Sequence, residues 1–173
     1  MGYWGYYVVG RSERPLAELD ALAEAGGGGG LVLRTTAPDG WQVWEYPSGQ
    51  GEMGNMTTLA RETGAPALFG YVMDSDCVAV EAAAPDGGAW TACLAREAMA
   101  RYVGGEGELG VDDYFLEPAD AVDWAVAWAA EAGHTVPAQP LLGVLTEASD
   151  PERGQLAENL FFRFLDRLGV VPL

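Results

Sequence analysis

Residues 65–84, APALFGYVMDSDCVAVEAAA, constrain the fold more than any other stretch of the chain. Two apolar runs, Ala67–Met73 and Cys77–Ala83, lie on either side of the turn-forming sequence DSD at 74–76. Apolar runs of this length that are rich in Val and aromatic residues and end at turn residues predict β-strands. The stretch therefore predicts a hairpin. Because its first run has no polar side, we expect that strand to be buried on both faces.

The other predicted strands lie before and after this hairpin. Tyr3–Val9 is aromatic and β-branched on both faces, which is typical of a central strand. Leu31–Thr36 and Trp41–Tyr46 are separated by the turn sequence PDG and predict a second hairpin. A further turn sequence, PDGG, leads into a short strand over Ala89–Thr91.

Two short helices are predicted among these strands. Leu16, Leu19 and Leu22 repeat at helical spacing, so we expect an amphipathic helix over Pro15–Ala25 that ends at a run of five glycines. The second helix covers Met56–Thr63, because an Asn suited to capping precedes it and a Gly suited to termination follows it.

The second half of the chain has helical rather than strand periodicity. Cys93–Val103 and Ala119–Ala132 are predicted helices, and the proline before the second one suits a first helical turn. Leu141–Leu145 is compatible with a short strand or a loop. The glycine-rich acidic segment Gly104–Asp113 is predicted to be a loop.

The last predicted helix is capped by Asp150 and has Pro151 as its first residue. It ends just before Gly169. Its apolar stripe comprises Leu156, Leu160, Phe161, Phe164, Leu165 and Leu168. Strands followed by helices predict an α+β fold, in which a mainly antiparallel sheet of about five or six strands from the N-terminal half packs with the C-terminal helices. The 173 residues are expected to form a single globular domain, 1–173.

The charge of the chain limits its partners. Nine Arg and no Lys oppose 26 acidic residues, which gives a formal net charge of −17. Nucleic-acid binding requires cations that neutralise phosphates, and an anionic membrane repels such a chain, so we expect neither as a partner. Such a charge can attract a basic protein, or it can serve solubility alone. The high Ala and Gly content, with Arg in place of Lys, resembles the composition of proteins from bacteria with GC-rich genomes.

The same sequence features indicate a cytoplasmic protein. The N-terminus lacks a basic stretch followed by a long apolar core, and no uninterrupted apolar run approaches the roughly 18 residues of a membrane span. Cys77 and Cys93 lie in apolar surroundings and have neither the spacing of a disulfide framework nor that of a metal site.

Residues suited to catalysis are sparse. His134 is the only histidine, and it follows a glycine at a predicted helix end, where a solvated or capping role is expected. The chain has no GxSxG and no HExxH, and without Lys it cannot form a P-loop. We therefore predict no catalytic residue, no metal site and no cofactor. Asp74 and Asp76 could still hold a divalent cation, as the similar DxD of glycosyltransferases does, or could simply form an Asp-rich turn.

The segment Tyr102–Glu152 holds eleven acidic residues and no Arg, and its densest part, Glu106–Asp123, also carries aromatic residues. On a surface of this kind, the charge can steer a partner and the aromatic residues can anchor it. The alternative is a solvated face whose aromatic residues point into the core. We predict an interface for a basic protein partner. The predicted partner-binding residues are Glu106, Glu108, Asp112, Asp113, Tyr114, Glu117 and Asp120.

In charge and fold class the chain resembles the small acidic immunity proteins and nuclease inhibitors of bacteria. This resemblance implies that the protein neutralises a basic partner by binding it. Self-association through the apolar stripe of the last predicted helix is a further possibility, which would give a homo-oligomer.

A second hypothesis is a protein or enzyme that binds a small molecule or a nucleotide at the loop Gly49–Gly54 and nearby aromatic residues. Residues 49–54, GQGEMG, form a GxGxxG between a predicted strand and a predicted helix. Over about residues 41–76 the chain resembles the dinucleotide-binding fingerprint of Rossmann-type dehydrogenases, in which glycines let the backbone approach a pyrophosphate. The half-polar strand before the loop, Pro47 and the predicted hairpins depart from that βαβ pattern. The residues predicted to bind this ligand are Trp41, Trp44, Gly49, Gly51, Gly54 and Asp74.

Overall fold

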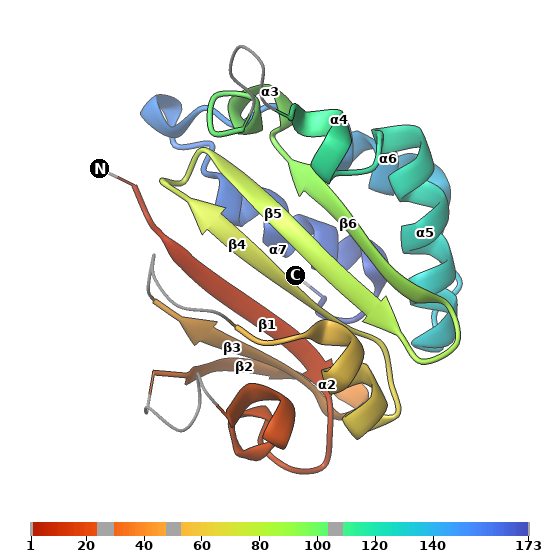
Figure 1. The fold of residues 1–173 in the computed structure, drawn as a ribbon. Helices are drawn as coiled ribbons and strands as arrows, with labels where there is room; N and C mark the ends of the chain where they lie inside the picture. The colour runs from red at the N-terminus through yellow and green to blue at the C-terminus, as the bar shows by residue number, and fades with distance from the viewer. Residues whose placement is uncertain (1, 24–29, 48–52, 104–108, 173) are drawn as a thin grey trace.

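A six-stranded antiparallel sheet lies at the centre of the molecule, as Figure 1 shows, and confirms the predicted α+β fold. The computed structural model describes residues 2–23, 30–47, 53–103 and 109–172. The strands are β1 (Gly5–Arg11), β2 (Val32–Ala37), β3 (Trp41–Tyr46), β4 (Ala67–Met73), β5 (Cys77–Ala84) and β6 (Gly88–Leu94). Their order across the sheet is β2-β3-β1-β4-β5-β6, so β1 and β4 form the central pair.

The predicted hairpin is formed by β4 and β5, which pair from Met73 with Cys77 to Ala67 with Ala83. Asp74 has a φ of 52° and the next residue a φ of 55°, so both central residues of the turn are left-handed. A turn of this kind matches the right-handed twist of the two strands. Asp tolerates the left-handed region because its side chain bonds to nearby backbone.

Two connections cross the same face of the sheet. Since β3 is antiparallel to both β1 and β2, the chain must cross over from β1 to reach β2, and it does so through the 3₁₀ turns η1 (Leu16–Glu18) and η2 (Asp20–Leu22). The chain passes from β3 to β4 through α2 (Met56–Thr63), with β1 between these two strands. In Figure 1 α2 lies in front of the sheet. We call this side the α2 face.

A small core holds these connections against the α2 face. Its fully buried members are Val8, Leu16, Leu19, Leu22, Met53, Met56, Leu59, Ala60, Ala67 and Ala83. The α2 helix begins and ends as predicted, because Asn55 Oδ1 accepts a hydrogen bond from the Thr58 amide and Gly64 ends the helix with a φ of 71°. A helix of eight residues covers only part of the sheet.

The opposite face carries the main core. Three helices pack on it or beside it, namely α5 (Pro118–Glu131), α6 (Ala138–Thr146) and α7 (Ala157–Leu168). Phe161 of α7 lies directly over Gly70 of β4, where an added Cβ would stand 2.5 Å from the Phe161 ring. Trp128 of α5 donates its indole N–H to the carbonyl oxygens of Ala67 and Ala83, at 3.2 and 3.1 Å. We call this side the α7 face.

The helix predicted over Pro15–Ala25 is wrong over residues 15–22, whereas Ala23 is helical and residues 24–25 lie outside the described residues. In its place are two 3₁₀ turns separated by Leu19, whose backbone is extended. The buried side chain of Gln42 explains the difference. Its amide nitrogen donates to the carbonyls of Ser12 and Arg14 and its oxygen accepts from the Leu16 amide, so this segment bonds to the sheet rather than to a helix of its own.

Two other predictions fail because sheet pairing and helical packing override the local pattern. The helix predicted over Cys93–Val103 is reduced to α3 (Arg96–Met99), since β6 continues to Leu94 in register with β5. The segment Leu141–Leu145, left open as strand or loop, belongs to helix α6. Short apolar runs of this kind do not distinguish a strand from a buried helix.

The last helix starts later than predicted. Pro151 opens a 3₁₀ turn, η4 (Pro151–Arg153), which Gly154 ends with a φ of 80° before α7 begins. Asp150 makes no side-chain cap. Gly169 ends α7 as predicted, with a φ of 85°. The predicted apolar stripe of α7 is buried within the chain, apart from Leu156 before its first residue, and so is not exposed to a second copy.

Within the described residues, no helix has both the length and the apolar character needed to cross a membrane.

Candidate functional site: an acidic groove beside strand β6

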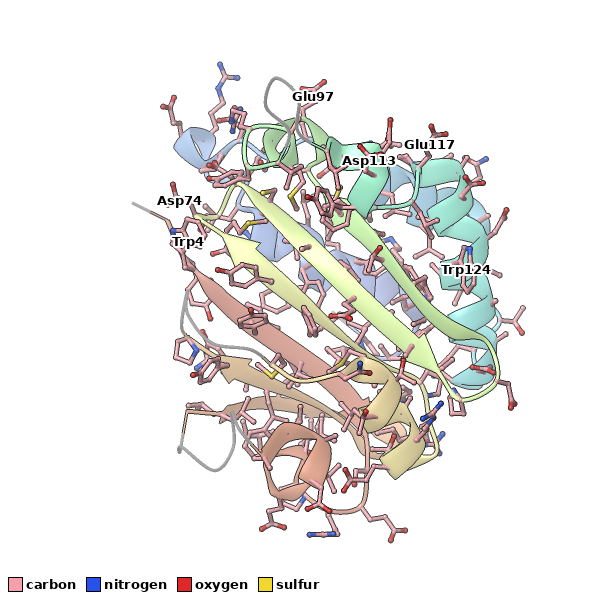
Figure 2. The ribbon with its side chains drawn as sticks, in the orientation of Figure 1. Trp4, Asp74, Glu97, Asp113, Glu117 and Trp124 are labelled. Atoms are coloured by element: carbon pink, nitrogen blue, oxygen red, sulfur yellow. The ribbon has the colours of Figure 1, made fainter. Side chains whose placement is uncertain are left out.

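A groove runs along the outer edge of β6, between this strand and the helices that follow it. Figure 2 shows Asp113 and Glu117 at one end of the groove and Trp124 further along α5. Its first part is a depression of about 470 Å³ beside α4 (Val111–Tyr114). The residues that give this part its character are Trp90, Asp112, Asp113, Tyr114, Glu117, Asp120 and Trp124.

The second part of the groove is a smaller pocket of about 290 Å³. Trp90, Trp124 and Trp128 line it together with Asp123 and Glu131. Trp90 and Trp124 also line the first part, so the two parts adjoin. We call the two parts together the acidic groove and the smaller one the Trp pocket.

The two tryptophans of α5 that lie one helical turn apart have different roles. Trp128 is 1% exposed and bonds to the sheet through its indole N–H. Trp124 is 40% exposed and stands at the edge of the buried stripe of the helix, where its ring forms a wall of the groove. Tyr114 is 49% exposed at the other end. The groove therefore has aromatic surface available to a partner.

Most acidic side chains of the groove lack a cation. Arg96 pairs with Asp112 and donates to the Leu116 carbonyl, and it is the only basic residue beside the groove in the described part of the chain. The side chains of Glu117, Asp120 and Asp123 form no hydrogen bond or ion pair with the described residues. The negative charge here is therefore largely uncompensated.

Glu131 is held by one oxygen and leaves the other unused. Its Oε1 accepts hydrogen bonds from the amides of Asp86 and Gly87, at 3.0 and 2.9 Å, which fastens the β5–β6 turn to α5. Its Oε2 is buried and has no partner among the described residues. A buried acceptor without a donor is costly, so a ligand that donates to it would gain binding energy.

The edge of β6 beside the groove is partly closed to strand pairing. Leu116 donates its amide to the Thr91 carbonyl at 3.0 Å, and the Thr91 hydroxyl donates to the Tyr114 carbonyl at 2.7 Å. These bonds occupy backbone groups that an added strand would need. A partner would therefore bind here through its side chains.

The structure brings together five of the seven predicted partner-binding residues. Asp112, Asp113 and Tyr114 lie on α4, while Glu117 and Asp120 lie at the start of α5. Glu106 and Glu108 lie outside the described residues. The residues that the prediction omitted are Trp90, Asp123, Trp124, Trp128 and Glu131. Asp123 and Trp124 fall in or beside the acidic stretch, but nothing in the sequence links Trp90 to it.

The structure separates the residues predicted for the nucleotide site. Trp41 is 1% exposed on the α7 face, with its ring 5.9 Å from that of Trp128, whereas Trp44 lies on the α2 face and donates its indole N–H to Gln42. Gly54 packs against the Ala21 carbonyl. Gly49 and Gly51 lie outside the described residues. Because β1 separates β3 from β4, these strands do not form the adjacent parallel pair of a dinucleotide-binding unit.

Asp74 and its neighbours fasten chain segments together. Asp74 Oδ1 accepts from the Gly2 amide at 2.6 Å, and the Ser75 hydroxyl accepts from the Tyr3 amide and donates to Glu158. Asp76 accepts a hydrogen bond from the Tyr102 hydroxyl at 2.7 Å. Figure 2 places Asp74 near the N-terminus of the chain, away from the acidic groove. In the described part of the chain, no group of three or more His, Cys, Asp or Glu is arranged to hold a metal ion.

A second candidate site, a row of aromatic rings beside a carboxylate, lies on the part of the α2 face that α2 leaves uncovered. Aromatic residues of β1 and β4 form a continuous row there, in which Tyr6 stacks on Tyr71 at 4.4 Å and meets Phe69 edge-on at 5.4 Å. Trp4 extends the row beyond Tyr71, at 6.3 Å. Glu81 of β5 pairs across the strands with Phe69. It is the single charged residue of β5.

Glu81 lines a hollow of about 380 Å³ together with Tyr6, Met53, Gly54, Asn55 and Phe69. Burial raises the pKa of its carboxyl group above the usual range, and no charged neighbour contributes to that shift. None of the nine arginines, all of which the structure describes, forms an ion pair with it. A half-buried carboxylate flanked by aromatic rings was not predicted. The one signal for it was a lone Glu within an apolar strand.

Comparison of the chain with models of known protein families, with curated proteins and with solved structures finds no match.

Proposed function

We propose that this protein binds a basic segment of a partner protein in the acidic groove and acts through that binding. Neutralisation of a basic toxin or nuclease is one such role. The observation that carries the proposal is the Trp pocket, where Trp90 and Trp124 form walls and Glu131 Oε2 is a buried acceptor without a donor.

The Trp pocket suits an arginine side chain. A guanidinium group stacks on an indole face through its π-system and charge, and its N–H groups donate in a fixed fork. Glu131 Oε2 and the Asp123 carboxylate supply acceptors in a pocket of about 290 Å³. An inserted arginine would therefore satisfy the orphaned oxygen of Glu131 and cover the exposed ring of Trp124.

The remaining acidic residues of the groove would steer the partner rather than hold it. Glu117 and Asp120 are exposed and lack partners among the described residues. Charges of this kind raise the association rate at low salt and contribute little to affinity once screened. The net charge of −17 acts in the same direction over a longer range.

Random dodecapeptides displayed on phage and selected on the immobilised protein test this proposal. We expect the selected peptides to be enriched in Arg and Lys and to bind synthetically with an affinity that falls as salt rises. The variant Glu117→Gln with Asp120→Asn and Asp123→Asn should bind them at least about tenfold more weakly at low salt.

A matched control separates the groove from the general charge. Glu13→Gln with Glu18→Gln and Glu152→Gln removes the same number of charges from exposed sites elsewhere. This control should bind the peptides nearly as well as the unchanged protein. Selected peptides without a basic bias, or equal loss of binding in both triple variants, would contradict a specific role of the groove.

A further inference from the structure

The hollow beside Glu81 is a separate feature from the acidic groove and calls for a different ligand. It lies on the open part of the α2 face, bounded by β1, β4 and β5 and by the segment that leads into α2. Its walls are the rings of Tyr6 and Phe69 on one side and residues Met53–Asn55 on the other. Glu81 is the only charged residue among the described residues that line it.

The surroundings of Glu81 determine the sign of the charge that the ligand must carry. Burial removes water from the carboxylate, and no cation within the described residues replaces it. Asn55 cannot supply a charge, and its Oδ1 already caps α2. The negative face of an aromatic ring also attracts cations. Both features repel phosphate, so they argue against the nucleotide predicted from the neighbouring GxGxxG sequence.

We infer that this hollow binds a small organic cation, an alkylammonium or a guanidinium compound, between the Tyr6 and Phe69 rings and the Glu81 carboxylate. The carboxylate pairs with the charged nitrogen, and the two rings contact the alkyl groups or the guanidinium plane. The volume of about 380 Å³ admits a ligand of this size and is within the range of small-molecule pockets.

The neighbouring residues leave room for such a ligand. On this face the cross-strand partner of Tyr71 is Ala79, and that of Glu81 on β6 is Thr91, so small side chains lie beside the aromatic row. Large residues at these positions would fill the space over β5 and β6. The aromatic rings therefore remain partly exposed next to the carboxylate.

Titration followed by NMR chemical shifts tests the inference with four defined probes. Choline, n-butylammonium and n-butylguanidinium supply the cation, while 3,3-dimethyl-1-butanol is a neutral compound with the shape of choline. We expect at least one cation to bind with a dissociation constant of about 1 mM or less and the neutral compound to bind at least about tenfold more weakly. The shifts should centre on Tyr6, Phe69 and Glu81.

Variants identify the groups responsible. Glu81→Gln should weaken the cation at least about tenfold, whereas Glu81→Asp, which keeps the charge, should retain part of the affinity. Tyr6→Leu should weaken the cation by roughly threefold to tenfold and leave the neutral compound unchanged, because it removes the π-system but keeps an apolar side chain. Glu117→Gln in the acidic groove is the matched control and should not change these affinities.

Three results would overturn the inference. They are a lack of saturable binding by all three cations up to about 50 mM, equal binding of the cation by Glu81→Gln, and equal binding of the neutral compound by the unchanged protein. Each of these results leaves the proposal for the acidic groove unaffected, since the peptide experiment tests a different site. Failure of that experiment likewise leaves the hollow beside Glu81 untouched.

Discussion

The α7 face and the α2 face of the sheet are both rich in aromatic residues, but they differ in how completely they are covered. On the α7 face, Phe161 packs over Gly70 and within 6.1 Å of Tyr7, and it has no exposed surface. On the α2 face, Tyr6 and Phe69 also contact each other, yet both remain partly exposed beside a carboxylate. Three helices cover the first face, whereas the short helix α2 and two 3₁₀ turns cover part of the second.

This difference separates stability from binding. A ring that is fully buried contributes its whole transfer free energy to folding. A ring left partly exposed forgoes part of that contribution and keeps surface for a ligand. The α7 face should therefore determine the stability of the fold, while the open α2 face and the acidic groove can change with small effect on it.

The largest effect should come from Phe161→Ala. The substitution removes a fully buried ring over Gly70, and we expect a loss of about 3–5 kcal/mol in the free energy of unfolding, measured with urea. Phe69→Ala on the other face is the matched change and should cost less, because that ring is already partly exposed. Equal losses would show that the two faces do not differ in the way described.

Trp124→Ala should change binding more than stability. The ring is 40% exposed in the Trp pocket, so its loss should weaken the selected basic peptides by about thirtyfold, or ~2 kcal/mol. The free energy of unfolding should fall by less than about 1 kcal/mol. Isothermal titration and urea unfolding of the same sample provide the two values. A large loss of stability with unchanged peptide affinity would make Trp124 a structural residue.

Glu81→Gln should stabilise the protein at neutral pH, by roughly 1 kcal/mol or less. Burial raises the pKa of Glu81 in the folded state, so the folded protein keeps its proton to a higher pH than the unfolded chain does. Stability therefore falls as the pH rises through this window, and an amide avoids the loss. Below about pH 4 the carboxyl is protonated in both states, and the advantage of Gln should disappear.

Thermal unfolding at several pH values measures this difference. Other side chains on this face, among them the phenols of Tyr6, Tyr46 and Tyr71, are the same in both proteins. A Gln variant that is more stable but no longer binds organic cations would indicate that the carboxylate is retained for binding. An advantage that persists at acid pH would contradict burial as its cause.

The smallest effect concerns the two cysteines on the covered part of the sheet. Burial raises the pKa of Cys77 to about 12 and that of Cys93 to about 11. At pH 8 neither thiol should be ionised to a useful extent, so iodoacetamide should not label the folded protein within hours. Both should react rapidly in urea. Labelling of one cysteine in the folded state would show that its part of the sheet opens.

The parts of the fold that could be predicted are those fixed by local chemistry. The β4–β5 hairpin, the Asn55 cap and the glycine that ends α7 each depend on residues close in sequence. The segments that could not be predicted depend on distant partners. Gln42 holds residues 12–16 against the sheet, and β5 keeps Cys93 and Leu94 in a strand. Neither contact leaves a local pattern.

The candidate sites divide in the same way. The acidic residues of α4 and α5 could be predicted as a group because they lie close together in the sequence. Trp90 and Glu131 could not, because the fold brings them to the groove from β6 and from the end of α5. The hollow beside Glu81 likewise combines β1, the residues before α2, β4 and β5. Tyr114 and most of the exposed carboxylates of the groove could be predicted from the sequence, whereas Trp90, Glu131 and the hollow beside Glu81 depend on the fold.

The turn at residues 74–76 has a consequence for the order of folding. Ser75 bonds to Tyr3 and to Glu158, across 72 and 83 residues of chain. Contacts between residues so far apart in sequence cost loop-closure entropy and form slowly. The β4–β5 hairpin can form early, but these bonds can close only when the first strand and the last helix have both arrived. Protection of the Tyr3 and Ala157 amides from hydrogen exchange would therefore report the final step of folding.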